Sequence, residues 1–362
     1  MSSPEQPTES PPRTPAGPSR RGLVIRLVLS LGLAVAFAAA LWPYLRAIPE
    51  DLHVAAWAIP VYLLTLLPYH LARAGRWHFL LRPLGTIRAA DSLRISMAGY
   101  MWIALLPFRL GELARPLLLT QRSDISVHRA LGTVAIERVL DGLVICGLFF
   151  AASAGGTRAP IEALEQATTG VMALFGVALV GLLFMARFPR AMGGIIDATV
   201  GRVLPRAGRW ASELSHGISQ GLAALPRGGP LLAFVVVTLL YWGSNAAGMW
   251  VLAHGCELPL SPRGAVLVMA VMNIALLVPG GPAQLGIFQT GVALGLHLVL
   301  PPETIRDDGS VFTFYLYLCQ LGTITAAGVW AQRSLRLDWR AVVRLRAEPV
   351  PPPAPAPAAE DR

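Results

Sequence analysis

Six apolar segments, each long enough to cross a lipid bilayer as a helix, constrain the fold of this chain more than any other feature. They cover residues 23–42, 54–71, 131–152, 170–186, 231–253 and 311–331. A transmembrane helix needs about 20 mostly apolar residues to cross the hydrocarbon layer. The chain is 54% hydrophobic and only 14% charged, which is typical of integral membrane proteins and not of soluble domains. The sequence therefore predicts an all-α, polytopic helical membrane protein.

The two ends of the chain differ in composition from this apolar part. Residues 1–19 are rich in Pro, Ser and Thr, and residues 348–362 form a tail rich in Pro and Ala. Such segments lack the apolar side chains needed to form a packed core. We expect two disordered tails around one membrane domain at residues 20–336.

Two further apolar regions, 92–120 and 264–300, are interrupted in the middle and contain a similar short sequence. Residues 101–107 read MWIALLP and residues 272–279 read MNIALLVP, and a Gly-bearing, partly polar stretch follows each. Paired, interrupted hydrophobic segments in corresponding places of two halves are typical of transporters, where they form the substrate site. Chance similarity between stretches rich in Ala and Leu is the alternative reading.

The arginine residues predict the orientation of the chain in the membrane. The net charge of +9 comes from arginine alone, since the sequence contains no lysine. Basic loops stay in the cytoplasm; this rule assigns the N-terminus, residues 72–91, 109–130 and 187–230, and the C-terminus to that side. The more acidic loops 153–169 and 301–310 are then outside.

This orientation has a consequence for the two interrupted regions. Region 92–120 must leave the cytoplasm and return to it, whereas region 264–300 must begin and end outside. The simplest solution is about six full spans plus two re-entrant hairpins that enter from opposite sides, in an inverted-repeat-like arrangement. Irregular backbone at membrane depth needs protein or a water-filled cavity around it. We therefore expect the two hairpin tips to line a cavity.

Charged residues gather at the first hairpin and in the following span. The first tip holds Arg109, Gly111, Glu112 and Arg115, and the span at 131–152 contains Glu137, Arg138 and Asp141. Spacing predicts that Glu112 pairs with Arg115 and that Arg138 pairs with Asp141. Charges inside a membrane are costly and therefore should face the bundle and pair. Arg109, Arg115 and Arg138 balance the three carboxylates in a near-neutral network, and they are candidates for binding a polar head group. A solvated loop ion pair and a purely structural clamp are the alternatives.

The second tip is rich in glycine and carries no charge. Its candidate substrate-binding residues are Pro279, Gly280, Gly281, Gly286 and Gln289. A glycine-rich turn that opens a helix presents free backbone N–H groups and the positive end of the helix dipole, which suits a phosphate. By contrast, His70, Arg73, Arg76 and Trp77 resemble an interfacial belt.

Several functional classes have little support in the sequence. The three cysteines show no metal-type spacing and the histidines form no cluster, so we expect no metal site and no cofactor. No basic patch with stacking aromatics is present, so we expect no nucleic-acid partner. No ATP-binding Gly-x-x-x-x-Gly-Lys motif exists, which leaves transport passive, ion-coupled or driven by a partner.

Three motifs resemble those of one family. The stretches Pro107–Arg115 (PFRLGELAR), Glu137–Asp141 (ERVLD) and Pro279–Gln289 (PGGPAQLGIFQ) are similar to motifs of the lysylphosphatidylglycerol synthase transmembrane-region family. This resemblance covers about residues 23–332 and implies a lipid-flippase module. Fused members carry a soluble aminoacyltransferase domain after the module, and similar stand-alone proteins are linked to polyprenol-linked or hopanoid lipid pathways.

The chain departs from the family pattern in two ways. Gln289 stands where the family usually has Glu, which argues against a proton-carrying carboxylate there. No transferase domain is recognisable, because the largest cytoplasmic loop, 187–230, is far shorter than an independent catalytic domain.

These observations together predict an integral membrane flippase that moves an anionic lipid, either a phospholipid or a polyprenyl-phosphate-linked one, between leaflets. We expect it in the bacterial inner (plasma) membrane, with both termini cytoplasmic and with enzymes of lipid or polysaccharide synthesis as partners. A membrane-embedded transferase acting on a lipid-phosphate substrate, for aminoacyl-phospholipid or glycolipid synthesis, is the second hypothesis. A non-catalytic scaffold of such a pathway is the third.

Overall fold

The protein is helical throughout the part that the computed structural model describes. These residues are 52–106, 111–188, 228–278 and 281–338, together with 198, 212 and 215–220. The predicted span at 23–42 and the two predicted tails lie outside the described residues. The predicted all-α class is confirmed, and the number of membrane spans stays a prediction.

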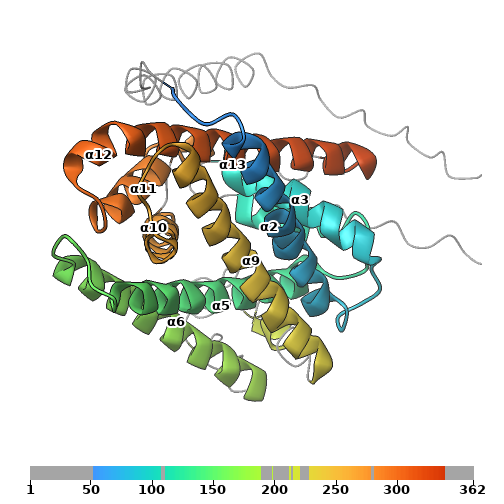
Figure 1. Ribbon diagram of the computed structural model, residues 1–362. Coiled ribbons are helices and arrows are strands. Elements are labelled where there is room, and N and C mark those ends of the chain that lie inside the picture. The colour runs from blue at the N-terminus through green and yellow to red at the C-terminus, as the bar shows by residue number, and fades with distance from the viewer. Residues whose placement is uncertain are drawn as a thin grey trace, which may run out of the picture. The chain divides into compact units, whose positions relative to one another are not determined.

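Five long helices form the frame of the described part (Figure 1). They are α2 (Ala58–Leu81), α5 (Val127–Ser153), α6 (Glu162–Arg187), α9 (Gly229–Gly255) and α13 (Asp308–Ser334). Each overlaps one of the apolar segments predicted to span the membrane. Three stretches, Glu162–Met185, Leu231–Gly255 and Pro302–Ser334, are long and apolar enough to cross a membrane by length and composition. The helices α2 and α5 are as long, but both carry charged residues in their interior.

Two interrupted hairpins complete the part of the chain that the structure describes, and they lie in the regions that the sequence predicts. The first consists of α3 (Ala89–Leu105) and α4 (Ala114–Leu119). The second consists of α10 (Pro262–Ala275), the 3₁₀ turn η3 (Pro282–Gln284) and α11 (Ile287–His297), and the short α12 (Pro302–Arg306) links it to α13.

Local chemistry explains where these shorter helices begin and end. Leu106, which directly precedes a proline in the sequence, is extended with φ −80° and ψ 137°, as expected for a residue in that position. At the start of α10 the Ser261 hydroxyl accepts a hydrogen bond from the Gly264 N–H at 3.0 Å, and Pro262 occupies the first turn. On α11, Gly291 and Gly295 pack directly on the backbone of α10, where an added Cβ would come within 2.9 Å and 2.7 Å of Cα atoms. Small residues four apart allow this close helix approach.

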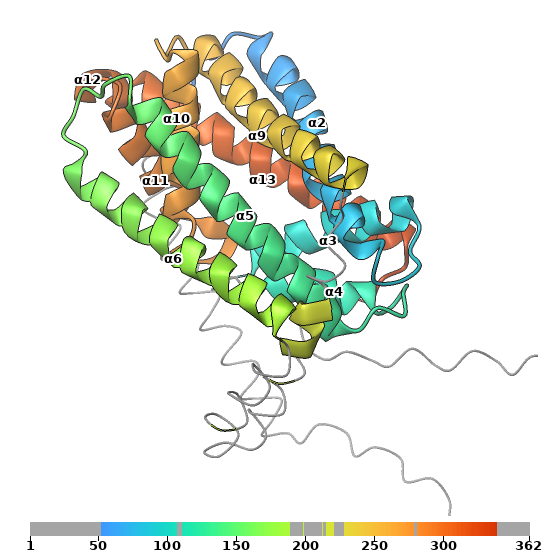
Figure 2. The ribbon, with the colours of Figure 1, turned by 90° about the horizontal axis from the view of Figure 1, so that it is seen from below.

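The packing of the helices repeats between the two halves of the chain. Each half contains a long helix, an interrupted hairpin and a second long helix: α2, α3–α4 and α5 in the first, and α9, α10–α11 and α13 in the second. The helix α3 packs against α13, and its counterpart α10 packs against α5. The two leading helices, α2 and α9, pack on each other most extensively of all (Figure 2). Such reciprocal contacts are the mark of two equivalent units related by a two-fold operation.

The equivalent helices α2 and α9 run antiparallel. Near the start of α2 the Ala55 N–H donates a hydrogen bond to the carbonyl oxygen of Gly255, at the end of α9, at 2.8 Å. Further along, the rings of Tyr69 and Tyr241 stack with centroids 5.1 Å apart, and Arg76 lies 6.0 Å from the ring of Phe234. An antiparallel pair of equivalent helices is the arrangement expected of an inverted repeat.

A polar layer separates two hydrophobic cores. On α2, residues up to Ala72 pack in one core and residues from Ala74 onward pack in the other, apart from the arginines between them. The same division occurs on α5, where Val134 belongs to the second core and Ile145 to the first. The residues on α2, α5 and α13 at the boundary are Arg73, Arg76, Glu137, Arg138, Asp141, Gln320 and Thr323. The charged groups of α2 and α5 at this boundary therefore occupy one level part-way along the helices.

Candidate functional site

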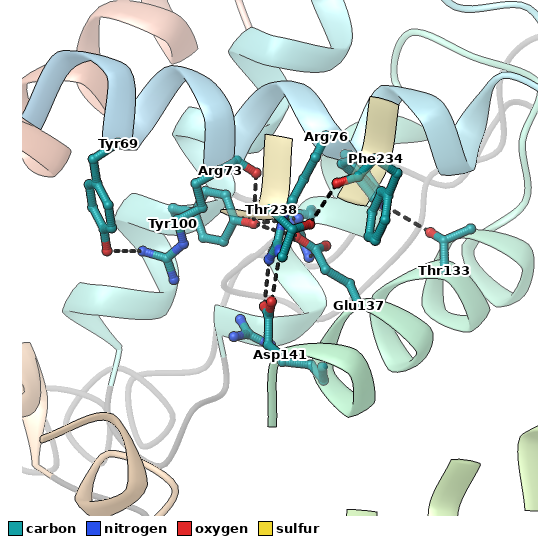
Figure 3. A network of polar contacts seen from close by, with 12 residues as sticks. Tyr69, Arg73, Arg76, Tyr100, Thr133, Glu137, Asp141, Phe234 and Thr238 are labelled. Carbon is teal, nitrogen blue, oxygen red and sulfur yellow. Dashed lines mark hydrogen bonds and ion pairs between the residues drawn. The ribbon is translucent and has the colours of Figure 1, made fainter. Parts of the chain in front are cut away.

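The centre of the polar layer is a salt bridge between α2 and α5. Arg76 donates to both carboxylate oxygens of Asp141, from Nη1 to Oδ1 at 2.6 Å and from Nη2 to Oδ2 at 2.5 Å. Its Nε donates to Glu137 Oε1 at 3.0 Å (Figure 3). The Arg76 side chain is 1% exposed and the Asp141 side chain 12%, so this forked contact is largely removed from solvent. A bidentate guanidinium–carboxylate pair fixes the two helices in one relative position.

The returning arm of the first hairpin joins the same cluster through Arg115. Arg115 Nη2 donates to Glu137 Oε2 at 2.6 Å, and its Nη1 donates to the Tyr100 hydroxyl at 2.9 Å. That hydroxyl in turn donates to Glu137 Oε1 at 2.9 Å. Glu137 thus accepts from α2, α3 and α4 at once, and it determines how these elements meet.

A second ion pair lies closer to open space. Arg138 Nε donates to Glu112 Oε2 at 3.0 Å, which connects α5 to the residues just before α4. The side chains of Arg138 and Glu112 are 28% and 22% exposed, in contrast to 0% for Arg115. This pair is therefore the accessible part of the network.

The predicted pairing of these charges is wrong, although the charges do come together. Glu112 pairs with Arg138 and not with Arg115, and Asp141 pairs with Arg76 and not with Arg138. Spacing along one helix gives only local partners, whereas here each carboxylate finds its arginine on another element. Arg109, which was predicted to belong to the network, lies outside the described residues.

Arg76 is the residue that sequence reasoning missed. The predicted interfacial belt is wrong for Arg76 and Trp77, which are 1% and 0% exposed. Trp77 Nε1 donates to Thr133 Oγ1 at 2.8 Å, which ties α2 to α5 one turn before Glu137. A signal was present in the sequence: the span containing Glu137 and Asp141 carries two carboxylates and one arginine, so a second cation had to come from another helix.

Gly111 allows the first hairpin to close. A Cβ at this position would lie 2.3 Å from the carbonyl carbon and oxygen of Trp102 and 2.4 Å from the amide nitrogen of Ile103. These are backbone atoms of α3, which cannot move aside. Gly111 therefore makes the close approach that the sequence predicts, and it places Glu112 beside Arg138.

Two adjoining cavities open at this level of the fold. The larger has a volume of about 390 Å³ and the smaller about 90 Å³. Among the described residues, both are lined by Arg73, Ile103, Asn273, Leu276 and Gln284. Ile103 lies at the end of α3, and Leu276 and Gln284 lie on either side of the interruption in the second hairpin, so residues of both hairpins meet there.

The larger cavity has a charged wall and an apolar wall. Arg73, Glu112, Arg138 and Asp141 form the charged wall. The apolar wall contains Ile145, Cys146, Phe175, Trp242, Ile274 and Leu277. Glu137 is linked to this wall through Arg76, which contacts both Glu137 and Asp141.

The second hairpin reaches the cavities through strained backbone. Ala283 and Gln284 adopt φ of 56° and 57°, a left-handed conformation that is uncommon for residues with a Cβ. The Tyr317 hydroxyl donates to the Ala283 carbonyl oxygen at 2.8 Å and holds the turn. Strain of this kind concentrates at functional sites.

The described residues that were predicted at the second tip do not line the cavities. Gln289 Oε1 accepts a hydrogen bond from the Gly286 N–H at 2.9 Å, so this side chain caps α11. Gly281, Gly286 and Gln289 are not among the described residues that line either cavity, whereas Gln284 lines both. Pro279 and Gly280 lie outside the described residues. No group of three His, Cys, Asp or Glu side chains in the described part of the chain is arranged to hold a metal ion.

One family model matches most of the chain. It is the lysylphosphatidylglycerol synthase TM region, and it matches residues 23–306. The chain belongs to this family. No curated protein and no solved structure matches it.

Family membership places the protein among membrane proteins of lipid metabolism or transport, embedded in the membrane and associated with its lipids. The region matched to the lysylphosphatidylglycerol synthase TM region contains both hairpins and the whole charged network. The helix α13 follows the matched region, yet its Tyr317, Gln320, Leu321 and Ile324 complete the wall of the smaller cavity.

Proposed function

We propose that the protein moves a lipid with an anionic head group between the two leaflets of a bacterial plasma membrane. The observation that supports this proposal is the larger cavity, with its charged wall, its apolar wall and its position between the two interrupted hairpins. A lipid has the same division, because a charged head group is joined to apolar chains. A cavity of this kind accommodates both parts at a level where the surrounding cores are apolar.

The proposed site has an accessible part and a supporting part. In the accessible part, Arg138, Glu112 and Asp141 line the cavity and would face the head group. We assign Arg109, which lies outside the described residues, to the same part. In the supporting part, Arg115 and Glu137 orient these side chains and Gly111 closes the hairpin. From the second hairpin we also assign Pro279, Gly280, Gly281, Gly286 and Gln289 to the site, of which Pro279 and Gly280 lie outside the described residues.

The reciprocal packing of the two halves supports a mechanism of alternating access. In transporters built from inverted repeats, one repeat rocks against the other around a fixed site. Here α3 packs on α13 and α10 packs on α5, so each hairpin is held by the other half of the molecule. A movement of the halves would therefore open the cavity to one leaflet and close it to the other.

A reconstitution experiment tests this function. Purified protein in liposomes is given phosphatidylglycerol with a fluorescent group, and a membrane-impermeant reductant quenches the label in the outer leaflet. We expect the inner-leaflet label to become accessible faster with the protein than in empty liposomes. Glu112→Gln should slow the flipping rate at least about tenfold, because the change breaks the accessible ion pair with Arg138. A tenfold change in rate corresponds to about 1.4 kcal/mol. Glu162→Gln, at the exposed start of α6, is the matched control and should leave the rate unchanged.

The same experiment separates the alternatives. Recovery of a chemically changed lipid would support the membrane-embedded transferase, and neither flipping nor product would support the scaffold. If the Glu112→Gln variant flips the lipid at the wild-type rate, the proposed site is wrong although the proposed function still holds.

A further inference from the structure

One cation in the polar layer, Arg73, has no carboxylate partner among the described residues. Arg73 lies one turn before Arg76 on α2, half-buried, and it lines both cavities. We propose that Arg73 binds the phosphate group of the ligand and that the arginines of the ion-pair network do not. This inference rests on the proposed function, which it deepens by naming the ligand chemistry and the residue that holds it.

Among the described residues, the hydrogen-bond and cation–π partners of the Arg73 side chain are all tyrosines. Its Nη1 donates to the Tyr69 hydroxyl at 3.3 Å, and its guanidinium carbon lies 4.0 Å from the centroid of the Tyr100 ring. The rings of Tyr69 and Tyr241 are at 6.0 Å and 5.9 Å. Aromatic rings hold a cation in place without neutralising its charge. Figure 3 shows Arg73 turned toward Tyr69, whereas Arg76 reaches the carboxylates.

Counting charges leaves Arg73 unbalanced within the described part of the chain. Glu112, Glu137 and Asp141 are paired with Arg138, Arg115 and Arg76. These three pairs are neutral together, so Arg73 adds one positive charge to the walls of the cavities. The stretches 107–110 and 279–280, which lie outside the described residues, contain no acidic residue that could balance Arg73, and the first of them adds a further cation, Arg109. An isolated charge in an apolar surrounding is costly and is tolerated best where a counter-ion binds.

The guanidinium group suits a phosphate in shape as well as in charge. It presents N–H donors in a fixed fork that matches two phosphate oxygens. Within the described part of the chain, one of these donors is occupied, by the Tyr69 hydroxyl. Each of the other arginines, Arg76, Arg115 and Arg138, already donates to a carboxylate. Asn273 and Gln284 line the same two cavities from the second half of the chain and bring amide groups to the space around Arg73. A phosphate at Arg73 would thus lie between the halves that are proposed to move.

Binding to the full-length protein in detergent tests the assignment. The probes are dioctanoyl phosphatidylglycerol, dioctanoylglycerol, which lacks the phosphate, and inorganic phosphate, each titrated by microscale thermophoresis. We expect the phospholipid to bind, dioctanoylglycerol to bind at least about tenfold more weakly, and Arg73→Gln to lose a similar factor for the phospholipid. This size follows from the strength of hydrogen bonds to charged groups. Inorganic phosphate that binds as tightly as the phospholipid would identify a free anion as the ligand, still held by Arg73.

A control variant, a stability measurement and a conservative variant distinguish lost binding from lost folding. Arg82→Gln, at the exposed end of the same helix, is the matched control and should bind the phospholipid like the wild type. In the absence of ligand, Arg73→Gln should unfold at the same temperature as the wild type or higher, because it removes an unpaired charge and breaks no ion pair. Arg73→Lys keeps the charge but not the fork, and it should bind with intermediate affinity.

Wild-type affinity of Arg73→Gln for phosphatidylglycerol would overturn the assignment, and so would equal binding of dioctanoylglycerol by the wild-type protein. These results are distinct from a failure of the proposed function, since a phosphate can bind at Arg73 in a protein that does not flip lipids. Binding lost in Arg73→Gln together with no flipping by the wild type would keep the binding site and refute the transport.

Discussion

Glu137 offers the sharpest test of the buried network, through the substitution Glu137→Gln. The carboxylate accepts from Arg76 Nε at 3.0 Å, from the Tyr100 hydroxyl at 2.9 Å and from Arg115 Nη2 at 2.6 Å. Glutamine has the same shape but only one acceptor oxygen. Its NH₂ group would face at least one N–H or O–H donor, and the network would gain a net positive charge.

The expected cost is large because none of these groups can turn to water. Glu137 is 1% exposed and Arg115 is 0% exposed. Removing one partner of a buried ion pair typically destabilises a protein by about 3–5 kcal/mol. We expect Glu137→Gln to lower the free energy of unfolding by this amount. The assay is an SDS titration of the protein in mixed micelles, followed by far-UV circular dichroism.

A double variant shows whether charge imbalance causes the loss. Arg115→Met with Glu137→Gln removes one charge of each sign and leaves the Arg76–Asp141 and Arg138–Glu112 pairs intact. The double variant should be more stable than the sum of the two single losses by about 1–3 kcal/mol. Glu162→Gln is the exposed control and should change the stability by less than about 0.5 kcal/mol.

Two results would refute this reasoning. One is a loss of less than about 1 kcal/mol in Glu137→Gln, which would mean that water or another group replaces the missing acceptor. The other is strict additivity of the double variant, which would mean that the two side chains are not coupled despite the 2.6 Å contact.

Further predictions concern the hairpins. Gly111→Ala should cost about 1–3 kcal/mol in the same unfolding assay, because the new methyl group would meet the backbone of Trp102 at 2.3 Å; Gly147→Ala, with open space around it, should be neutral, and equal stability of both variants would contradict the close approach. Cysteines introduced at the exposed residues Thr86 and Glu303 should react with a membrane-impermeant maleimide from opposite sides, the first from the cytoplasm. Labelling of both from one side would rule out opposed hairpins, and the three buried native cysteines should not interfere.

The fold was largely predictable because its signals are local. Long apolar runs gave α5, α6, α9 and α13, and the interruptions near residues 107 and 279 fall between α3 and α4 and between α10 and α11. Proline and glycine act on their own backbone and on the residue before them, so they can be recognised without knowledge of the neighbours. The family resemblance rested on the same stretches and is confirmed by the match over residues 23–306.

The sequence identified which charged residues take part in ion pairs, but not their partners. Glu112, Arg115, Glu137, Arg138 and Asp141 all form ion pairs in the structure, and their role in binding a ligand stays a prediction. Their partners were wrong because spacing along a helix cannot tell which other helix comes close. The turn at Ala283 and Gln284, which reaches both cavities, was expected to act through its glycines and instead carries strain at two residues with side chains.

The sequence by itself determined that this chain forms membrane helices with two interrupted hairpins, since apolar length and backbone breakers depend on neighbouring residues alone. Only the tertiary structure decided what the arginines of α2 do. Arg73 and Arg76 lie three residues apart in the same polar, aromatic stretch, and nothing in that stretch distinguishes them. The packing of α2 against α5 brings Arg76 to two carboxylates and surrounds Arg73 with tyrosines beside open space. Because a buried charge is governed by the groups around it, this difference exists only in the folded protein.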